Sequence, residues 1–116
     1  MDCRSVSIRI GVTCLDRINQ FCEDVNNRVD SRSEFMGFCA ARQANRIIAG
    51  KAPSYVKLTE ASTEDIETTT ITISLSKRRE ELIEQACHRT KHKLSLFIVW
   101  ATMAELDVIE GRKAVA

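Results

Sequence analysis

The sequence lacks a long hydrophobic run, an export signal and a strong excess of either charge. Its longest apolar run, Leu96 to Ala104, includes a threonine and is far too short to span a bilayer. Residues 1–11 do not show the charged and then apolar segments of a signal peptide, so we expect a cytoplasmic protein without a membrane partner. The net charge is only +1, so the protein as a whole does not attract anions strongly. An anionic partner would have to bind where basic side chains are clustered.

Patterns typical of catalytic and metal sites are also missing. The five cysteines stand at irregular spacing without a CxxC pair, which is typical of reduced thiols in a cytosolic protein. No glycine-rich phosphate loop or carboxylate pair stands out. Cys87 lies too close to His88 and His92 along one helix to form a nucleophile–base pair. The histidines have a spacing that could hold zinc, but no second ligand pair accompanies them. We therefore expect no enzyme, no cofactor and no metal site.

What the sequence does contain is two short stretches in which apolar and polar residues alternate. Residues 4–11 (RSVSIRIG) and 68–76 (TTTITISLS) each place aliphatic side chains on one face. Such alternation predicts a strand with one buried and one solvated face. The polar faces consist of Ser5, Ser7 and Arg9 in the first stretch and of Thr70, Thr72 and Ser74 in the second.

Two helical patterns follow the first strand. Thr13 is the expected N-cap of the first helix, after which apolar residues recur at helical spacing. This apolar face comprises Leu15, Ile18, Phe21 or Cys22, and Val25. Ser31 is the expected N-cap of the second helix, and Glu34 completes a capping box. Gly50 is the expected stop of that helix.

The same order of elements recurs about 65 residues later, a shift at which Val6 aligns with Ile71. Ser76 is expected to cap the third helix and Ser95 the fourth, with Gly111 ending it. The fourth helix is apolar nearly all round, which predicts burial on several sides. The predicted organisation is a first unit at residues 1–50, a linker at 51–68 and a second unit at 69–116.

One unit, with roughly 45 residues and a single strand, is too small to bury its own apolar faces. A lone strand also leaves its backbone donors and acceptors unpaired. Antiparallel pairing of the two strands solves both problems, because it lays their aliphatic faces on four helices. The expected fold is therefore mainly α with a short two-stranded antiparallel β-ribbon, in one compact domain.

An alternating strand, an amphipathic helix and then SRSEF (residues 31–35) opening a second helix resemble the ribbon-helix-helix DNA-binding family, which includes Arc and MetJ. Family members usually carry one unit per chain and dimerise. This chain resembles two units fused into a pseudo-dimer, a tandem form similar to some relaxosome accessory proteins of conjugative plasmids. In the second unit SLFI stands in place of SRSE, so the resemblance there is one of pattern.

The resemblance implies that the ribbon enters the major groove of double-stranded DNA and that its six outward side chains touch base edges. Arg9 is the strongest candidate, because a guanidinium can donate two hydrogen bonds to guanine O6 and N7. The family also holds phosphates on backbone amides at the start of the second helix, with help from flanking cations. The implied phosphate contacts are Arg4, Ser31, Arg32, Ser33, Lys77, Arg78, Lys93, Ser95 and Leu96. Ser31 and Ser95 can equally be plain helix caps.

On this basis we expect a sequence-specific DNA-binding protein of plasmid or phage type, nucleoid-associated and acting as a transcriptional repressor or autoregulator. Copies are expected to self-associate on adjacent sites. The first alternatives are a relaxosome accessory protein and an antitoxin whose acidic linker binds a toxin partner. A further alternative is a helical protein–protein adaptor without DNA binding. Salt dependence separates this last alternative, because phosphate-mediated binding weakens steeply as salt rises.

Overall fold

The computed structural model describes residues 3–51 and 67–115, without the side chains of residues 112–115. The elements in chain order are β1 (Cys3–Gly11), α1 (Val12–Glu23), the 3-10 turn η1 (Val25–Asn27), α2 (Arg32–Ile48), β2 (Thr68–Ser76), α3 (Lys77–Thr90) and α4 (Leu94–Val115). The prediction of a mainly helical chain with a two-stranded antiparallel sheet is thus confirmed. Most of the expected linker lies outside the described residues, and Thr68, its expected last residue, already belongs to β2.

The two strands pair with each other within one chain. They run antiparallel, with Ser7 opposite Thr72 at the centre and Cys3 opposite Ser76 at one end. Just past the other end, the backbone nitrogen of Val12 donates to the carbonyl of Glu67 at 3.1 Å. The pairing satisfies backbone groups that each strand alone would leave exposed.

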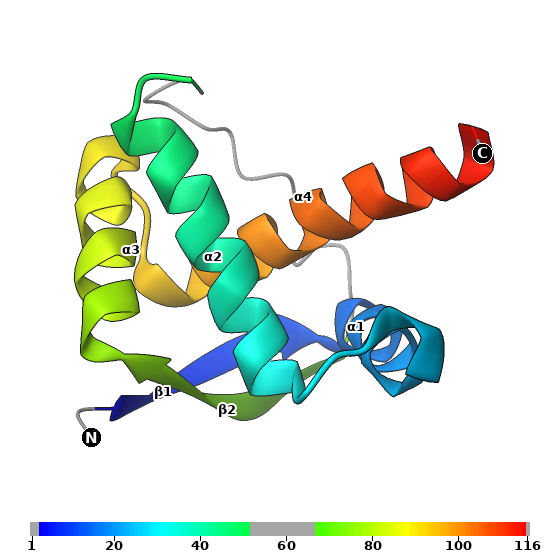
Figure 1. Ribbon diagram of the computed structural model, residues 1–116. Coiled ribbons are helices and arrows are strands. Elements are labelled where there is room, and N and C mark those ends of the chain that lie inside the picture. Colours follow the sequence, from blue (N-terminus) through cyan, green and yellow to red (C-terminus); the bar gives the residue numbers. More distant parts are fainter. Residues whose placement is uncertain (1–2, 52–66, 116) are drawn as a thin grey trace.

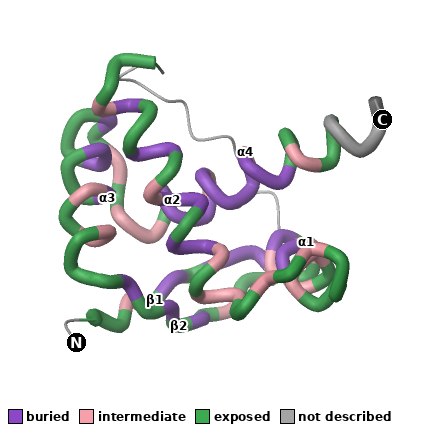
Figure 2. The backbone as a smooth tube through the Cα atoms, viewed as in Figure 1, coloured by how far each residue is buried: buried purple, intermediate pink, exposed green. Residues whose placement is uncertain are grey.

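The inner face of this ribbon forms the floor of the hydrophobic core (Figure 2). Its buried members are Ile8 and Ile10 from β1 and Ile71, Ile73 and Leu75 from β2. Full burial of one such side chain stabilises the fold by about 1.5–3 kcal/mol relative to exposure. The alternation therefore fixes which face of the ribbon is left to solvent, because a slip of one residue would expose all of the aliphatic side chains.

The helices cover the inner face of the ribbon, and α2 packs against both α3 and α4 (Figure 1). α2 and α4 cross over the two strands, with α2 against β2 and α4 against β1. α3 lies along α2, and α1 lies against α4. Gly37 lets α2 approach the ribbon closely, since a Cβ there would lie 3.2 Å from Leu75 Cδ2. At the crossing, Gln43 Nε2 donates to the buried carboxylate of Glu105 at 2.8 Å.

Two predicted helix caps and one predicted stop are confirmed. Ser31 Oγ accepts from the backbone nitrogen of Glu34 at the start of α2, and Ser76 Oγ accepts from that of Arg79 at the start of α3. Gly50 follows the end of α2 with a φ of +73°, a conformation that favours glycine. In the described parts of the chain, every helix is too short or too polar to cross a membrane.

The starts of the other two helices were predicted wrongly. Thr13 does not cap α1, because β1 continues directly into the helix through the extended Gly11. Ser95 does not cap α4, because the helix already begins at Leu94. Lys91, in the left-handed conformation, closes α3, and the helix restarts after a turn of three residues.

Two further details of the helical pattern are also corrected. Gly111 does not end α4, which continues to Val115. A single glycine in a helix costs only about 1 kcal/mol relative to alanine, which is too little to stop a helix by itself. Val25 is 85% exposed and so does not extend the apolar face of α1. The helix ends at Glu23, and Asp24 caps the 3-10 turn that follows, which breaks the helical spacing.

Candidate nucleic-acid interface

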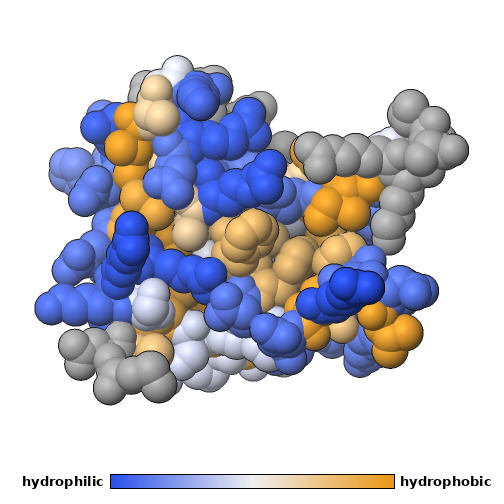
Figure 3. All heavy atoms as spheres, viewed as in Figure 1, coloured by the Kyte–Doolittle hydropathy of each residue, from blue (hydrophilic) through white to orange (hydrophobic). Residues whose placement is uncertain are grey.

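The outer face of the ribbon brings together the six polar side chains that the alternation placed there. All six are exposed, and the register pairs them as Ser5 with Ser74, Ser7 with Thr72 and Arg9 with Thr70. In Figure 3 the lower edge of the molecule, where Figure 1 places the ribbon, is a pale band of weakly polar residues. The surface is nearly all hydroxyl, with one guanidinium, and can both donate and accept hydrogen bonds.

Arg9 is held by a residue that the sequence analysis did not single out. Its Nε donates to Thr68 Oγ1 at 3.0 Å, while its two terminal nitrogens have no partner among the described residues. Thr68 lies two residues before Thr70 and therefore on the same outward face. Thr68 could have been predicted as a site residue by continuing the alternating pattern of the second strand from Thr70 back to Thr68.

Exposed cations gather at the end of the ribbon where Cys3 faces Ser76. Lys77 and Arg78 occupy the first positions of α3, and neither has an ion-pair partner in the part of the chain that the structure describes. Arg4 is 67% exposed in its side chain and makes a long ion pair of 3.4 Å with Glu80. This end of the ribbon therefore has the charge that contact with a phosphate backbone requires.

The hydroxyls at the start of α2 are both occupied within the fold. Ser31 caps the helix, and Ser33 Oγ accepts from the backbone nitrogen of Ser74 at 2.7 Å. Arg32 is half-buried, and its Nη1 donates to Asn19 Oδ1 at 3.1 Å. The first N–H groups of a helix have no intrahelical acceptor, and the helix dipole favours an anion near them. These backbone amides, rather than the serine hydroxyls, are thus the groups available for a phosphate.

The start of α4 has a different chemistry from the start of α2. Ser95 is the second residue of the helix and is half-buried, whereas Leu96 is 38% exposed. Lys91 and Lys93, both exposed, immediately precede the helix. The two helix starts thus offer backbone amides in both cases, with capping hydroxyls at one and lysine ammonium groups at the other.

The buried cysteines Cys39 and Cys87 do not form a reactive site. None of the five cysteines forms a disulfide, and burial raises the pKa of the Cys39 thiol to about 12 and that of the Cys87 thiol to about 11. A thiol is nucleophilic as its thiolate, so both are inert near neutral pH. Within the described residues, no group of three or more His, Cys, Asp and Glu side chains is placed to hold a metal ion.

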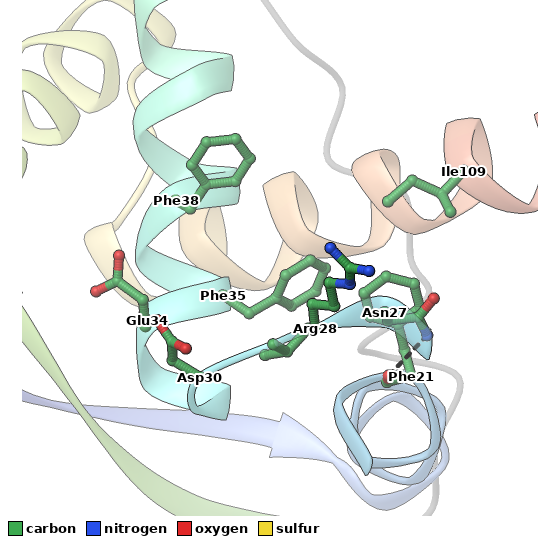
Figure 4. Close-up of a pocket in the computed structure, with 9 residues that line it drawn as sticks. Phe21, Asn27, Arg28, Asp30, Glu34, Phe35, Phe38 and Ile109 are labelled. Carbon is green, nitrogen blue, oxygen red and sulfur yellow. Dashed lines mark hydrogen bonds between the residues drawn. The ribbon is translucent and has the colours of Figure 1, made fainter. Parts of the chain in front are cut away.

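An aromatic groove that the sequence analysis missed lies away from the ribbon's outer face. The groove has a volume of about 350 Å³. Its lining residues come from α1, α2, α4 and the segment between α1 and α2 (Figure 4). The rings of Phe21 and Phe35 pack with centroids 4.8 Å apart, and Phe38 is 48% exposed. The remaining lining residues are Asn27, Arg28, Val29, Asp30, Glu34 and Ile109. Phe35 and Phe38 are three residues apart and so lie on one side of the same helix, and this spacing could have predicted an aromatic surface there.

Comparison with protein-family models, with curated proteins and with solved structures finds no match for this chain. Its function is therefore inferred from its own residues and their geometry.

Proposed function

We propose that this protein is a tandem ribbon-helix-helix protein that binds double-stranded DNA sequence-specifically through its β-ribbon, acting as a transcriptional repressor or autoregulator. The observation that carries the proposal is the ribbon itself. Two strands far apart in sequence pair so that their aliphatic faces are buried and six polar side chains face solvent together. The major groove of B-DNA, about 12 Å wide, admits a two-stranded ribbon.

The register of the ribbon supports a pseudo-dimeric arrangement. Adding 65 to the residue numbers of β1 gives those of β2, and the central pair, Ser7 and Thr72, also differs by 65. The helices that follow directly, α1 and α3, begin at Val12 and Lys77, which again differ by 65. Two units related in this way would each present an equivalent strand to one half of a DNA site. Symmetric dimeric DNA-binding proteins contact their two half-sites in the same manner.

The side chains on the two strands are not equivalent. At the shift of 65, Arg9 corresponds to Ser74, so only one half of the ribbon's outer face carries a guanidinium. Arginine can donate two hydrogen bonds to guanine, whereas a serine hydroxyl discriminates less between bases. The preferred DNA site should therefore have two unlike halves rather than a perfect palindrome.

The flanks of the ribbon supply groups for phosphate contacts. Lys77 and Arg78 offer free charge at one end, and the starts of α2 and α4 offer backbone amides. Contacts of this kind orient a protein on the duplex without reading its sequence. The small net charge is compatible with DNA binding if these groups act locally.

Selection of duplexes from a random library, followed by affinity measurement, tests the proposal. We expect enrichment of one asymmetric site, with affinity that falls steeply with salt because each neutralised phosphate adds about −0.9 to the logarithmic slope. Arg9→Ala should lose the preference for guanine at one base pair while retaining salt-dependent binding. No enriched sequence, or binding that ignores salt, would contradict the proposal.

A second candidate function is favoured by the aromatic groove. A helical adaptor would use Phe21, Phe35 and Phe38 to hold an apolar anchor from a partner protein, as grooves do for amphipathic helices. The two functions differ in their salt dependence, since apolar docking weakens little as salt rises. Phe38→Ser would abolish partner binding in the adaptor and leave DNA affinity unchanged in the DNA-binding protein.

A further inference from the structure

On the outer face of the ribbon, the Arg9 side chain leans toward the end at which Gly11 faces Thr68. Thr70 stands directly opposite, and Thr68, two residues nearer the start of β2, is one of the two diagonal neighbours of Arg9. Gly11, which follows Arg9 on the same face of β1, has no side chain to block this path. Diagonal neighbours in an antiparallel pair are within reach of a long side chain. The 3.0 Å bond between Arg9 Nε and Thr68 Oγ1 is the result.

This bond fixes the plane of the guanidinium. Nε, Nη1 and Nη2 lie in one rigid plane, so anchoring Nε–H on a neighbouring hydroxyl orients the other two nitrogens as a fork. Both terminal nitrogens remain without a partner among the described residues, and both are the donors that guanine O6 and N7 accept. A side chain held before binding also loses less conformational freedom when it binds.

We infer that Thr68 is a positioning residue that orients the Arg9 guanidinium for two hydrogen bonds to one guanine, and that it thereby makes one end of the DNA site guanine-specific. The inference rests on the DNA-binding function proposed above. It adds Thr68 as a residue that supports recognition and guanine as the base that is recognised. At the other end of the ribbon, Ser74 takes the place of Arg9, and its diagonal neighbour is Cys3. The outer face at that end has no guanidinium to orient, so it should tolerate base changes.

The experiment compares Thr68→Val, which removes the acceptor oxygen at nearly constant shape, with Thr68→Ser, which keeps it. Affinities are measured for the selected duplex, for duplexes changed at each single base pair, and for one with 7-deazaguanine at the Arg9 position. Thr68→Val should reduce the preference for guanine at that base pair by about five- to tenfold, whereas Thr68→Ser should retain it. Loss of N7 should weaken the wild type more than Thr68→Val.

Thr72→Val is the matched control, because it makes the same change at the other diagonal neighbour of Arg9, to which no Arg9 hydrogen bond is made. It should alter preference only at the central base pair. In an Arg9→Ala background, Thr68→Val should have no further effect on the guanine preference, since the group that it positions is gone. An equal effect of Thr68→Val with and without Arg9 would overturn the positioning role.

Failure of the inference and failure of the proposed function give different results. If the wild type selects an asymmetric site and Thr68→Val keeps the full guanine preference, the positioning role is wrong and DNA binding stands. If the wild type enriches no duplex, the DNA-binding proposal fails and the inference fails with it. Thermal unfolding of each variant shows whether a loss of affinity comes from loss of the fold.

Discussion

The hydroxyl of Ser33 lies 2.7 Å from the backbone nitrogen of Ser74 and 3.4 Å from its carbonyl oxygen. A side chain in the first turn of α2 thus satisfies two backbone groups of β2. The start of the helix and the outer face of the ribbon are held in one rigid arrangement. If both contact DNA, the distance between the phosphate contact and the base contact is set before binding.

Ser33→Ala should lower the free energy of unfolding by about 1–2 kcal/mol, because it leaves the backbone groups of Ser74 without their side-chain partner. Urea denaturation measures this loss, and hydrogen exchange at the Ser74 amide should be accelerated more than exchange at the centre of the ribbon. Ser5→Ala, at an exposed position opposite Ser74, is the control and should change stability by less than about 0.5 kcal/mol. Equal stability of the two variants would show that the bond does not hold the helix to the strand.

Gln43 and Glu105 should be energetically coupled, because each satisfies the other where α2 crosses α4. Gln43 Nε2 donates to Glu105 Oε1 at 2.8 Å, and Arg42 Nε lies 3.4 Å from the same oxygen. Gln43→Leu or Glu105→Leu alone should cost about 1–3 kcal/mol, since each leaves a buried polar group without this partner. The double variant should cost less than the sum by at least about 0.5 kcal/mol. Strict additivity in denaturant unfolding would contradict the coupling.

Stability should fall at alkaline pH because of Cys39. Burial raises the pKa of its thiol from an ordinary 9.0 to about 12, so the folded state keeps a proton that the unfolded state loses. The contribution of Cys39 to the free energy of unfolding is complete below pH 9 and is lost progressively between pH 9 and 12, with a loss of about 1 kcal/mol by pH 10.

Melting temperatures at pH 8 and pH 10 test this expectation. Cys39→Ala should show a smaller decrease between the two pH values than the wild type, whatever its stability at pH 8. Cys3→Ala, which removes an exposed thiol, should behave like the wild type. An identical decrease in all three proteins would exclude Cys39 as the cause.

Lys77 and Arg78 should contribute to DNA affinity without contributing to sequence preference. Replacing either with alanine is expected to weaken binding to all duplexes by a similar factor and to reduce the logarithmic salt slope by about 1. Arg79→Ala serves as the comparison, because Arg79 pairs with Glu34 at 2.9 Å and should affect stability more than the salt slope. A change in base preference in Lys77→Ala would assign that side chain to base contacts instead.

The parts of the fold that could be read from the sequence are those with strong local periodicity. The alternation in residues 68–76 marks β2 from Thr68 to Ser76, and the need to pair exposed backbone predicts its antiparallel partner. The caps at Ser31 and Ser76 could be predicted because serine satisfies free N–H groups at a helix start. The six outward residues of the ribbon follow from the same alternation.

The parts that could not be read depend on contacts between elements or on weak boundary signals. The Gln43–Glu105 pair joins residues from different helices, and no local pattern indicates it. Ser95 is as good a capping residue as Ser31, but α3 closes at the left-handed Lys91 and α4 begins at Leu94, two residues earlier than a cap at Ser95 requires. Thr68 differs from the predicted site residues only in lying nearer the end of its strand, where Arg9 reaches it.

Strand β1 pairs with β2, although residues 12–67 lie between the two paired segments. On the ribosome β1 therefore emerges long before its partner and must wait with an open edge until β2 has been translated. An unpaired edge can associate with another strand, and slow long-range closure prolongs that exposure. The serines and the arginine on its outer face keep one side of this nascent strand hydrated during the delay.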